Sequence, residues 1–467
     1  MTTSSQFAGI RFFRNTLVLA TSFALLSVMT LSGLASAITP STTAVTSIAV
    51  GTQPRGVAVS PDGSSVWVAN VGSGTVSRIN ATTNAVTSIT VGDQPRGIAV
   101  SPDGSSVWVA NLYSDTVSRI NTATNAVSSI AVGANPIGVA VSPDGLSVWV
   151  TNISSDTVSR VNTATNIVTS ITVGSFPIGV AVSPDGLSVW VGDSGGETVS
   201  RINTATNFVT SITVGSSPYN VAVSPDGSNV WAANYGSDTL SRIDTATNIV
   251  TSIAVGDRPN VVAVSPDSSS VWVTNIGSGT VSRIDTTTNT VTSIAVGTEP
   301  LGIAVSPDGS SVWVANTVSG TVSRIDTITD IVTSSITVGT EPHDVAVSPD
   351  GSSVWVTNIN GGTVSRITFP PQPPANVTAT PGNAQATISW TAPTNTGGSP
   401  ITGYTATASV GGQSCTTTTA TSCTISGLTN GTTYYVSVTA TNAVGVSDPS
   451  VVAVTPTSDP VAPAFTG

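Results

Sequence analysis

Short hydrophobic runs alternate with polar turns along most of the chain, and the pattern recurs. In one unit the stretches 57–59, 66–69, 76–79 and 86–91 have the period-two alternation and β-branched content of strands. Turn formers such as Pro61-Asp62-Gly63 separate these stretches. The pattern predicts four short antiparallel strands in every unit.

The triplet Ser-Pro-Asp marks the period of the repeat. Its copies begin 41 residues apart, except for a last interval of 42 that contains the doubled Ser334-Ser335. The eight copies begin at Ser60, Ser101, Ser142, Ser183, Ser224, Ser265, Ser306 and Ser348. Four strands in about 40 to 45 residues is the period of a propeller blade. We therefore predict an all-β chain with an eight-bladed β-propeller, and seven blades are the alternative.

The two ends of the repeat region indicate how the ring closes. The region begins at 44–48 with a fourth-strand sequence and ends at 364–367 with a third-strand sequence. The last unit therefore lacks one strand, which the N-terminal strand can supply so that no sheet edge stays exposed. An open solenoid is the alternative, but solenoids carry atypical capping repeats, and none is visible in the sequence.

One motif in the repeat resembles a known family. Trp149-Val150-Thr151-Asn152, with copies at Trp272 and Trp355, is similar to the YVTN β-propeller repeats of surface-layer and other secreted proteins. The resemblance covers residues 44–368 and departs in having Trp where the family name has Tyr. It implies a propeller that is displayed outside the cell.

A second domain follows the repeat. Residues 370–374 form a Pro-rich stretch that is typical of an extended linker, and residues 375–456, with Trp390 and Tyr434, resemble a bacterial fibronectin type III domain. That resemblance implies an immunoglobulin-like β-sandwich and an accessory role in polysaccharide degradation. Cys415 and Cys423 are expected to form a disulfide in an exported chain, and two free thiols are the alternative.

The N-terminus predicts export. Arg11 and Arg14 precede an apolar stretch, 16–34, and a small-residue cleavage site at 35–37. An uncleaved membrane anchor is the alternative. The expected organisation is a signal peptide at 1–37, a propeller at 38–369, a linker at 370–374, a fibronectin domain at 375–456 and a tail at 457–467. The protein is expected to be extracellular, secreted or attached to the cell surface, with no membrane span after cleavage.

Charge narrows the function classes. The formal net charge is -11, and no basic stripe is present, which disfavours nucleic acid as a partner. The chain contains no Lys, which excludes a lysine nucleophile. A repeated Trp is expected to pack between blades. A repeated Arg, one in each unit from Arg78 to Arg366, is expected to form ion pairs with the Asp of the Ser-Pro-Asp hairpins.

Function is sought where the copies differ. The differences concentrate in the loops that lead into each first strand and in the loops between second and third strands, which strand alternation places on one rim. Acids and aromatic residues gather there in blades two to five and form a candidate surface for an extracellular glycan, a cell-wall polymer or a protein, with Ca²⁺ as a cofactor that the carboxylates can hold. A solvated acidic rim is the alternative. The candidates are Tyr113, Asp115, Asp156, Phe176, Asp193, Glu197, Tyr219, Tyr235 and Asp238.

The single His of the chain carries the alternative function. His343 lies between Glu341 and Asp344 in a Pro-containing loop that is similar to loops of streptogramin lyases, and these three residues are the candidate catalytic group. One His gives little support to metal-assisted chemistry. We therefore predict a monomeric binding or adhesion scaffold. An extracellular lyase, or a glycoside-active hydrolase or other component of a polysaccharide-degrading system, is the alternative.

Overall fold

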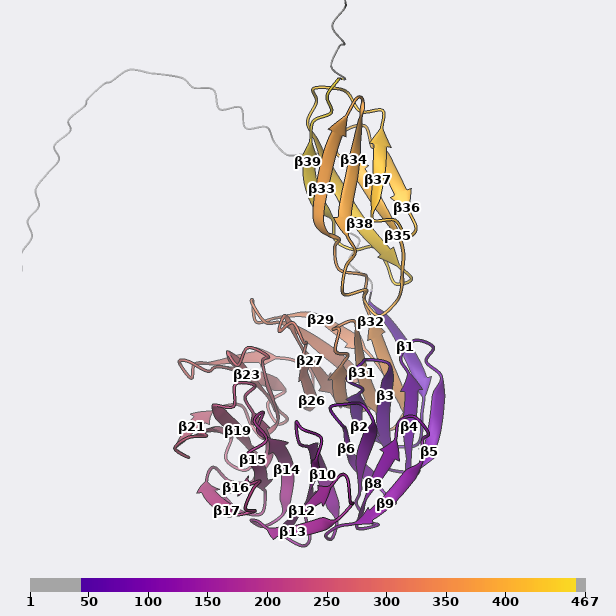
Figure 1. Ribbon diagram of the computed structural model, residues 1–467. Coiled ribbons are helices and arrows are strands. Elements are labelled where there is room, and N and C mark those ends of the chain that lie inside the picture. The colour runs from indigo at the N-terminus through magenta and orange to yellow at the C-terminus, as the bar shows by residue number, and fades with distance from the viewer. Residues whose placement is uncertain (1–42, 459–467) are drawn as a thin grey trace, which may run out of the picture. The chain divides into compact units, whose positions relative to one another are not determined.

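The computed structural model describes residues 43–458, and every regular element in this range is a β-strand. Residues 44–368 form eight four-stranded antiparallel sheets around a central axis, as the blades of a propeller do (Figure 1). The predicted all-β fold with a propeller is therefore confirmed. The predicted signal peptide lies outside the described residues. Within those residues, no helix has the length and hydrophobicity needed to cross a membrane.

Each sheet has four strand positions, counted outward from the axis. The innermost strands are β2 (Pro54–Val59), β6 (Pro95–Val100), β10 (Pro136–Val141), β14 (Pro177–Val182), β18 (Pro218–Val223), β22 (Pro259–Val264), β26 (Pro300–Val305) and β30 (Pro342–Val347). The second strands are β3 (Ser65–Asn70), β7 (Ser106–Asn111), β11 (Ser147–Asn152), β15 (Ser188–Asp193), β19 (Asn229–Asn234), β23 (Ser270–Asn275), β27 (Ser311–Asn316) and β31 (Ser353–Asn358).

The third strands are β4 (Thr75–Asn80), β8 (Thr116–Asn121), β12 (Thr157–Asn162), β16 (Thr198–Asn203), β20 (Thr239–Asp244), β24 (Thr280–Asp285), β28 (Thr321–Asp326) and β32 (Thr363–Thr368). The outermost strands are β5 (Val86–Thr90), β9 (Val127–Ala131), β13 (Val168–Thr172), β17 (Val209–Thr213), β21 (Val250–Ala254), β25 (Val291–Ala295), β29 (Ile331–Thr337) and β1 (Ala44–Ala49).

The ring closes through its N-terminal strand. β1 pairs antiparallel with β32, from Ala44 opposite Thr368 to Ala49 opposite Thr363, and completes the sheet of β30 and β31. β2 contacts both β6 and β30, so the first and last sheets are neighbours. The predicted closure is confirmed, and it protects the edge of β32 that would otherwise be free to pair with another chain.

The repeated Trp residues form the core between sheets, as predicted. Trp67 is fully buried and packs against Val107 and Val109 of the next sheet. Antiparallel register places Arg78 opposite Trp67, and its guanidinium carbon lies 5.0 Å from the ring centroid. The same stack recurs in all eight sheets at 4.9–5.6 Å. Each Arg therefore covers a Trp through a cation–π contact.

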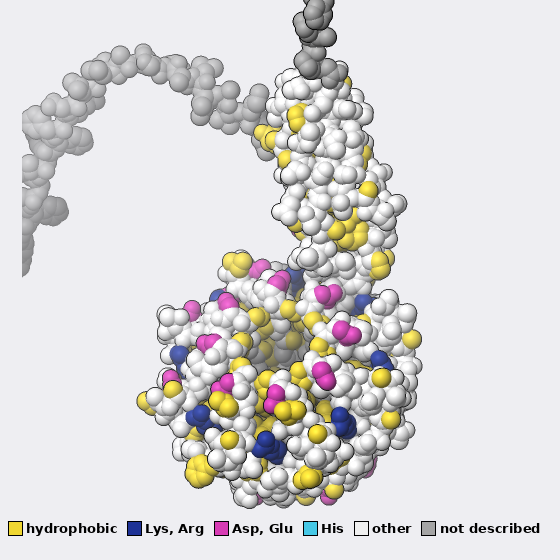
Figure 2. Space-filling model, viewed as in Figure 1, with side chains coloured by type: hydrophobic (Ala, Val, Ile, Leu, Met, Phe, Trp, Pro, Cys, Tyr) yellow, Lys and Arg dark blue, Asp and Glu magenta, His cyan; other side chains and the backbone are white. Residues whose placement is uncertain are grey.

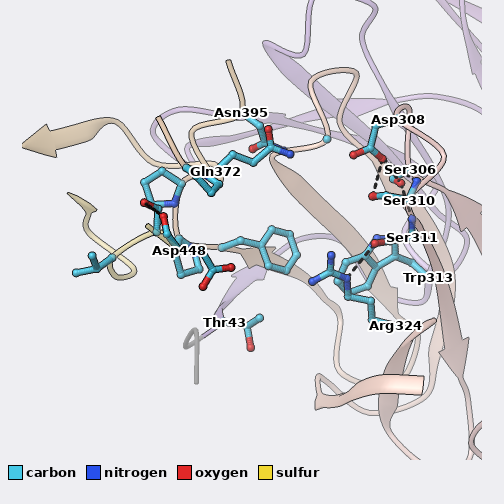
Figure 3. A pocket seen from close by; sticks show the side chains of 17 residues that line it. Thr43, Ser306, Asp308, Ser310, Ser311, Trp313, Arg324, Gln372, Asn395 and Asp448 are labelled. Carbon is cyan, nitrogen blue, oxygen red and sulfur yellow. Dashed lines mark hydrogen bonds between the residues drawn. The ribbon is translucent and has the colours of Figure 1, made fainter. Parts of the chain in front are cut away.

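The predicted ion pairs between these Arg residues and the hairpin Asp residues are wrong. Figure 3 shows the arrangement in the sheet of β26–β29: Asp308 accepts hydrogen bonds from Ser306 Oγ (2.6 Å) and Ser310 Oγ (2.9 Å), while Arg324 Nε donates to Ser311 Oγ (3.0 Å). The carboxylate is taken up by its own turn, as Asp side chains commonly are. Among residues 43–458 the ion pairs are Arg258–Asp257 and Arg283–Asp330.

Residues 375–454 form the predicted sandwich of two sheets. One sheet has the order β33-β34-β37, and the other has the order β36-β35-β38-β39. Trp390 and Tyr404 pack in its core with ring centroids 5.4 Å apart. Cys415 and Cys423 form a disulfide that joins β36 of one sheet to β37 of the other. The strands are β33 (Ala375–Gly382), β34 (Gln385–Thr391), β35 (Ile401–Ala408), β36 (Ser414–Thr417), β37 (Ser422–Ser426), β38 (Tyr434–Asn442) and β39 (Ser450–Val454).

Candidate ligand-binding site in the central channel

A cavity of about 650 Å³ lies at the centre of the ring, and all eight innermost strands contribute to its wall. Figure 2 shows the hollow with hydrophobic side chains around it. Smaller hollows lie over the Trp and Arg stacks of several sheets, each lined by the same Ser, Asp, Trp and Arg of the repeat. Those hollows belong to the scaffold, whereas the wall of the central cavity differs from sheet to sheet.

The backbone explains why the central wall can vary. In β2 the pairing with β3 passes from Pro54 opposite Asn70 to Val57 opposite Val68, so Arg55 has no partner across the sheet. The same irregularity follows the first Pro of every innermost strand. The residue after that Pro is therefore not constrained by strand pairing, and its identity can differ from one sheet to the next. These eight residues, which we call the channel ring, are Arg55, Arg96, Ile137, Ile178, Tyr219, Asn260, Leu301 and His343.

Glycine follows the channel ring in five of the eight strands because the innermost strands approach one another closely. A Cβ atom at Gly56 would lie 2.5 Å from the carbonyl oxygen of Arg96. In these five strands the channel-ring residue, rather than the residue that follows it, therefore supplies the side chain at the cavity.

Two neighbouring members of the channel ring are cationic. Arg55 and Arg96 line the cavity, and the Nε of Arg96 is buried without a hydrogen-bond partner. Burial lowers the pKa of Arg55, and the nearby charge of Arg96 lowers it further. Neither side chain takes part in an ion pair with any residue between 43 and 458. These two residues were missed by the sequence analysis, although comparing the repeats at the position after Pro would have found them.

Two of the predicted aromatic residues stand at the same cavity. Tyr219 belongs to the channel ring, and Tyr235 lies in the loop after β19. Their ring centroids are 6.2 Å apart, with the planes inclined by 40°. Tyr219 keeps 38% of its surface exposed, so this pair offers a face on which a planar ligand can stack.

Two of the three candidate catalytic residues, His343 and Asp344, line the cavity. His343 lines the cavity, and its Nδ1 is buried without a partner. Burial, followed by the charges of Arg55 and Arg96, lowers the pKa of His343 to about 4, so it is neutral at pH 7. Glu341 is not part of the cavity wall.

Asp344 stands where most innermost strands have Gly, and its carboxylate serves the backbone. Its Oδ2 accepts a hydrogen bond from the N–H of Val57 in the first sheet (3.1 Å), and its Oδ1 accepts one from Val345 N–H (2.9 Å). Burial raises the pKa of Asp344 to about 6. This side chain therefore links the last sheet to the first.

Three predicted rim acids cap loops. Asp115, Asp156 and Asp238 have φ values of 52°, 52° and 55°, the left-handed backbone that Gly adopts at the same position in other blades. Each carboxylate accepts a hydrogen bond from a backbone N–H of the following loop between sheets, at 2.8, 2.9 and 2.9 Å. The uneven charge of the rim thus follows from the residues that tolerate this conformation.

The remaining candidates lie outside the cavity wall. Asp193 is fully buried, so it offers no rim surface to a ligand, and burial raises its pKa to about 6. Phe176, half exposed, lies against Gly195 on the rim, and Tyr113 is 61% exposed. The carbonyl oxygen of Glu197 accepts a hydrogen bond from Val214 N–H. Of the predicted surface, only the Tyr219–Tyr235 pair therefore belongs to the cavity.

Carboxylates do not assemble into a metal site in the part of the chain that the structure describes. No three His, Cys, Asp or Glu residues between 43 and 458 lie close enough together to hold a metal ion.

Comparisons with known proteins agree with this architecture. The model of the Virginiamycin B lyase family matches residues 41–211 and 189–372, and that of the fibronectin type III domain matches residues 371–455. No curated protein matches the chain. Hydrazine synthase from Kuenenia stuttgartiensis is 25% identical, with a TM-score of 0.50, over 58% of this chain and 94% of that one. A functionally unknown protein from Desulfotomaculum acetoxidans is 16% identical, with a TM-score of 0.48, over 62% of this chain and 97% of that one.

The expected order of propeller repeats and a fibronectin domain is confirmed by these matches, and it fits a binding or scaffold protein. Because the two propeller matches together span residues 41–372, well over half of the sequence, the chain belongs to the Virginiamycin B lyase family and carries a fibronectin type III domain at its C-terminal side.

Proposed function

We propose that the protein is a secreted or cell-surface binding scaffold whose ligand enters the central cavity at the Tyr219–Tyr235 pair. One observation carries this proposal: the channel ring differs from sheet to sheet, whereas the second and third strands behind it repeat almost unchanged. A pocket of about 300 to 1,000 Å³ with apolar walls and a few polar groups is the usual form of a small-ligand site. The cavity, at about 650 Å³, is of that kind.

Export supports the extracellular part of the proposal. The predicted signal peptide at 1–37 and the Cys415–Cys423 disulfide both suit an oxidising compartment. In that setting the ligand classes are a glycan, a fragment of a cell-wall polymer or a peptide end. Each of these can place a flat face on the two Tyr rings.

A binding array tests the proposal. The mature chain is applied to immobilised cell-wall polysaccharides, peptidoglycan fragments and short peptides, with and without Ca²⁺. We expect at least one class to bind, and the double variant Tyr219→Ala/Tyr235→Ala to lose that binding about tenfold or more, since stacked aromatic contacts are often binding hot spots. Phe176→Ala is the matched control, because this aromatic side chain lies on the rim outside the cavity wall. Loss with Phe176→Ala and retention with the Tyr variant would place the site on the rim instead.

An extracellular lyase is the second candidate, and His343 is the observation that favours it. An elimination needs a base that removes a proton, and a neutral imidazole with a free Nδ1 in a cavity can act as one. The test measures ring opening of virginiamycin B, the compound named in the family description, by the unmodified protein and by His343→Gln. Turnover that His343→Gln abolishes would establish the lyase. No turnover by the unmodified protein would remove it.

A further inference from the structure

The arginines of the propeller differ in their surroundings. Eight of them stack on the repeated Trp residues. The remaining arginines among residues 43–458 are Arg55, Arg96 and Arg258. Arg258 lies on the rim beside Asp257, at 3.8 Å. Arg55 and Arg96 instead stand side by side in the cavity wall without an ion-pair partner.

The charge of the cavity wall is opposite in sign to that of the protein. Its wall holds two guanidinium groups, one carboxylate, Asp344, and a His343 that is neutral at pH 7. Both carboxylate oxygens of Asp344 already accept backbone N–H groups. The cavity is therefore a positively charged place in a chain whose formal net charge is -11.

Unsatisfied polar atoms mark this part of the wall. Arg96 Nε and His343 Nδ1 are both buried without a hydrogen-bond partner. Most other atoms of this kind among residues 43–458 are the repeated Trp Nε1 and Asn Oδ1 atoms of the scaffold, whereas these two belong to residues outside the repeat and line the cavity. Leaving a buried polar atom unpaired is costly, and more so when the group is charged. An anion that accepts hydrogen bonds from the two guanidinium groups would satisfy the Arg pair.

Much of the rest of the wall is apolar, apart from the amides of Asn220 and Asn260. Ile137 and Ile178 follow the Arg pair around the channel ring, and Ile276 and Leu301 stand beyond Tyr219 and Asn260. A ligand that fills this space needs a hydrophobic body. A polyanion or a small inorganic ion would leave these side chains in contact with water only.

We infer that the central cavity binds an amphiphilic organic acid, with its carboxylate on the Arg55–Arg96 pair and its aromatic or alkyl body against the Tyr pair and the Ile and Leu side chains. This inference rests on the proposed function and narrows the ligand classes named there to one with a free carboxylate and an apolar body, which among them a peptide end can provide. Arg suits the role because its planar fork matches the two oxygens of a carboxylate.

Titration calorimetry on the mature chain tests the inference. The probes are 4-hydroxycinnamate, 2-naphthoate and decanoate, the methyl ester of each acid, and galacturonate as an acid without an apolar body. We expect at least one of the three amphiphilic acids to bind, its ester to bind at least tenfold more weakly, and galacturonate to bind more weakly than that acid. Absence of binding by all three acids would overturn the inference.

Variants locate the anion. Arg96→Gln and Arg55→Gln are each expected to weaken binding of the acid tenfold or more and to leave the affinity for its ester within about twofold. Ile328→Glu lowers the net charge of the protein by the same amount at a side chain that is 88% exposed and outside the cavity wall, and is expected to change the affinity for the acid less than about twofold. An equal loss with Ile328→Glu would show that overall charge attracts the anion, and would overturn the assignment to the Arg pair.

Two further readouts separate the possible failures. Arg96→Gln removes a buried Nε atom that has no hydrogen-bond partner, so its melting temperature should equal or exceed that of the parent. A lower value would mean that Arg96 stabilises the scaffold, and would overturn the inference. If the Tyr219→Ala/Tyr235→Ala variant loses an array ligand that both Arg variants still bind normally, the proposed site stands and the carboxylate inference fails. If galacturonate binds more tightly than all three amphiphilic acids, the apolar body is wrong, and the inference fails in favour of an acidic glycan.

Discussion

Replacing Asp193 by Asn should stabilise the propeller, although it removes a charged residue from an acidic protein. Asp193 occupies the position at which the other seven sheets have Asn. In the neighbouring sheet, Asn152 Nδ2 donates hydrogen bonds to Thr157 Oγ1 and Ser159 Oγ, both at 3.0 Å. At Asp193 the direction is reversed, because Thr198 Oγ1 (3.0 Å) and Ser200 Oγ (2.8 Å) donate to Oδ2. The surroundings of this position therefore suit the neutral amide of Asn better than an ionised carboxylate.

The pKa of Asp193 sets the size and the sign of the effect. Burial is the largest cause, and it raises this pKa from 3.8 to about 6, which corresponds to up to about 3 kcal/mol between the two protonation states. The folded state therefore holds the proton more tightly than the unfolded state does. The free energy of unfolding falls as pH rises from about 4 to 6, and the full penalty remains at pH 7. Asp193→Asn removes that penalty.

Urea unfolding followed by Trp fluorescence measures the effect at pH 4.5, 5.5, 6.5 and 7.5. We expect Asp193→Asn to exceed the parent by up to about 3 kcal/mol at pH 7.5 and by much less at pH 4.5. Asn152→Asp is the matched control: it places a carboxylate at the equivalent site of the next sheet and should destabilise the protein with the same pH dependence. A stability difference that does not change with pH, or an Asn152→Asp protein as stable as its parent at pH 7.5, would refute the reasoning.

Three further predictions concern the scaffold. A chain that begins at Gly51 lacks β1 and leaves the edge of β32 unpaired, so it should self-associate in size-exclusion chromatography, whereas a chain that begins at Thr43 stays monomeric. Trp231→Ala should cost about 3 to 5 kcal/mol in urea unfolding, because this buried ring packs against Val271 and Val273 of the next sheet; an exposed-site change, Tyr113→Ala, should cost little. Cys415→Ser/Cys423→Ser should lower the stability of the fibronectin domain by about 2 to 3 kcal/mol and leave the propeller transition, monitored separately by calorimetry, where it was.

Most of the fold could be predicted from the sequence because the same pattern of strands and turns recurs in eight copies. Strand number, the burial of Trp67 and its copies, and the closing role of β1 all follow from periodicity and from the incomplete last unit. The Arg–Asp pairs were wrong because recurrence at one copy per blade says nothing of distance. Antiparallel register would have suggested the observed contact, since it places Arg78 directly opposite Trp67, whose ring the guanidinium covers.

The site was harder to predict, for two physical reasons. Some blades have Gly and others have Asp at the position of Asp115, because the backbone there has a left-handed conformation that both residues tolerate. When only the charges of the blades are compared, this difference is easily taken for a functional one. Burial of Asp193 depends on Gly174, which lies in the loop before β14 and packs against the carboxylate. No local pattern around Asp193 predicts that contact. The occurrence of Gly74 in one blade and Asp156 at the equivalent position of another already indicated a left-handed backbone conformation from the sequence.

The location of the channel ring explains how one molecule can combine a rigid repeat with a specific cavity. A residue such as Trp67 or Arg78 contacts the next sheet, and a change there disturbs an interface that recurs around the whole ring. Arg55 has no partner across its sheet, because the pairing skips from Pro54 to Val57. Changes at this position therefore leave the sheet pairing intact. Specificity can thus accumulate in the eight residues that face one another across the cavity, and we expect the chemistry of the ligand to be encoded there.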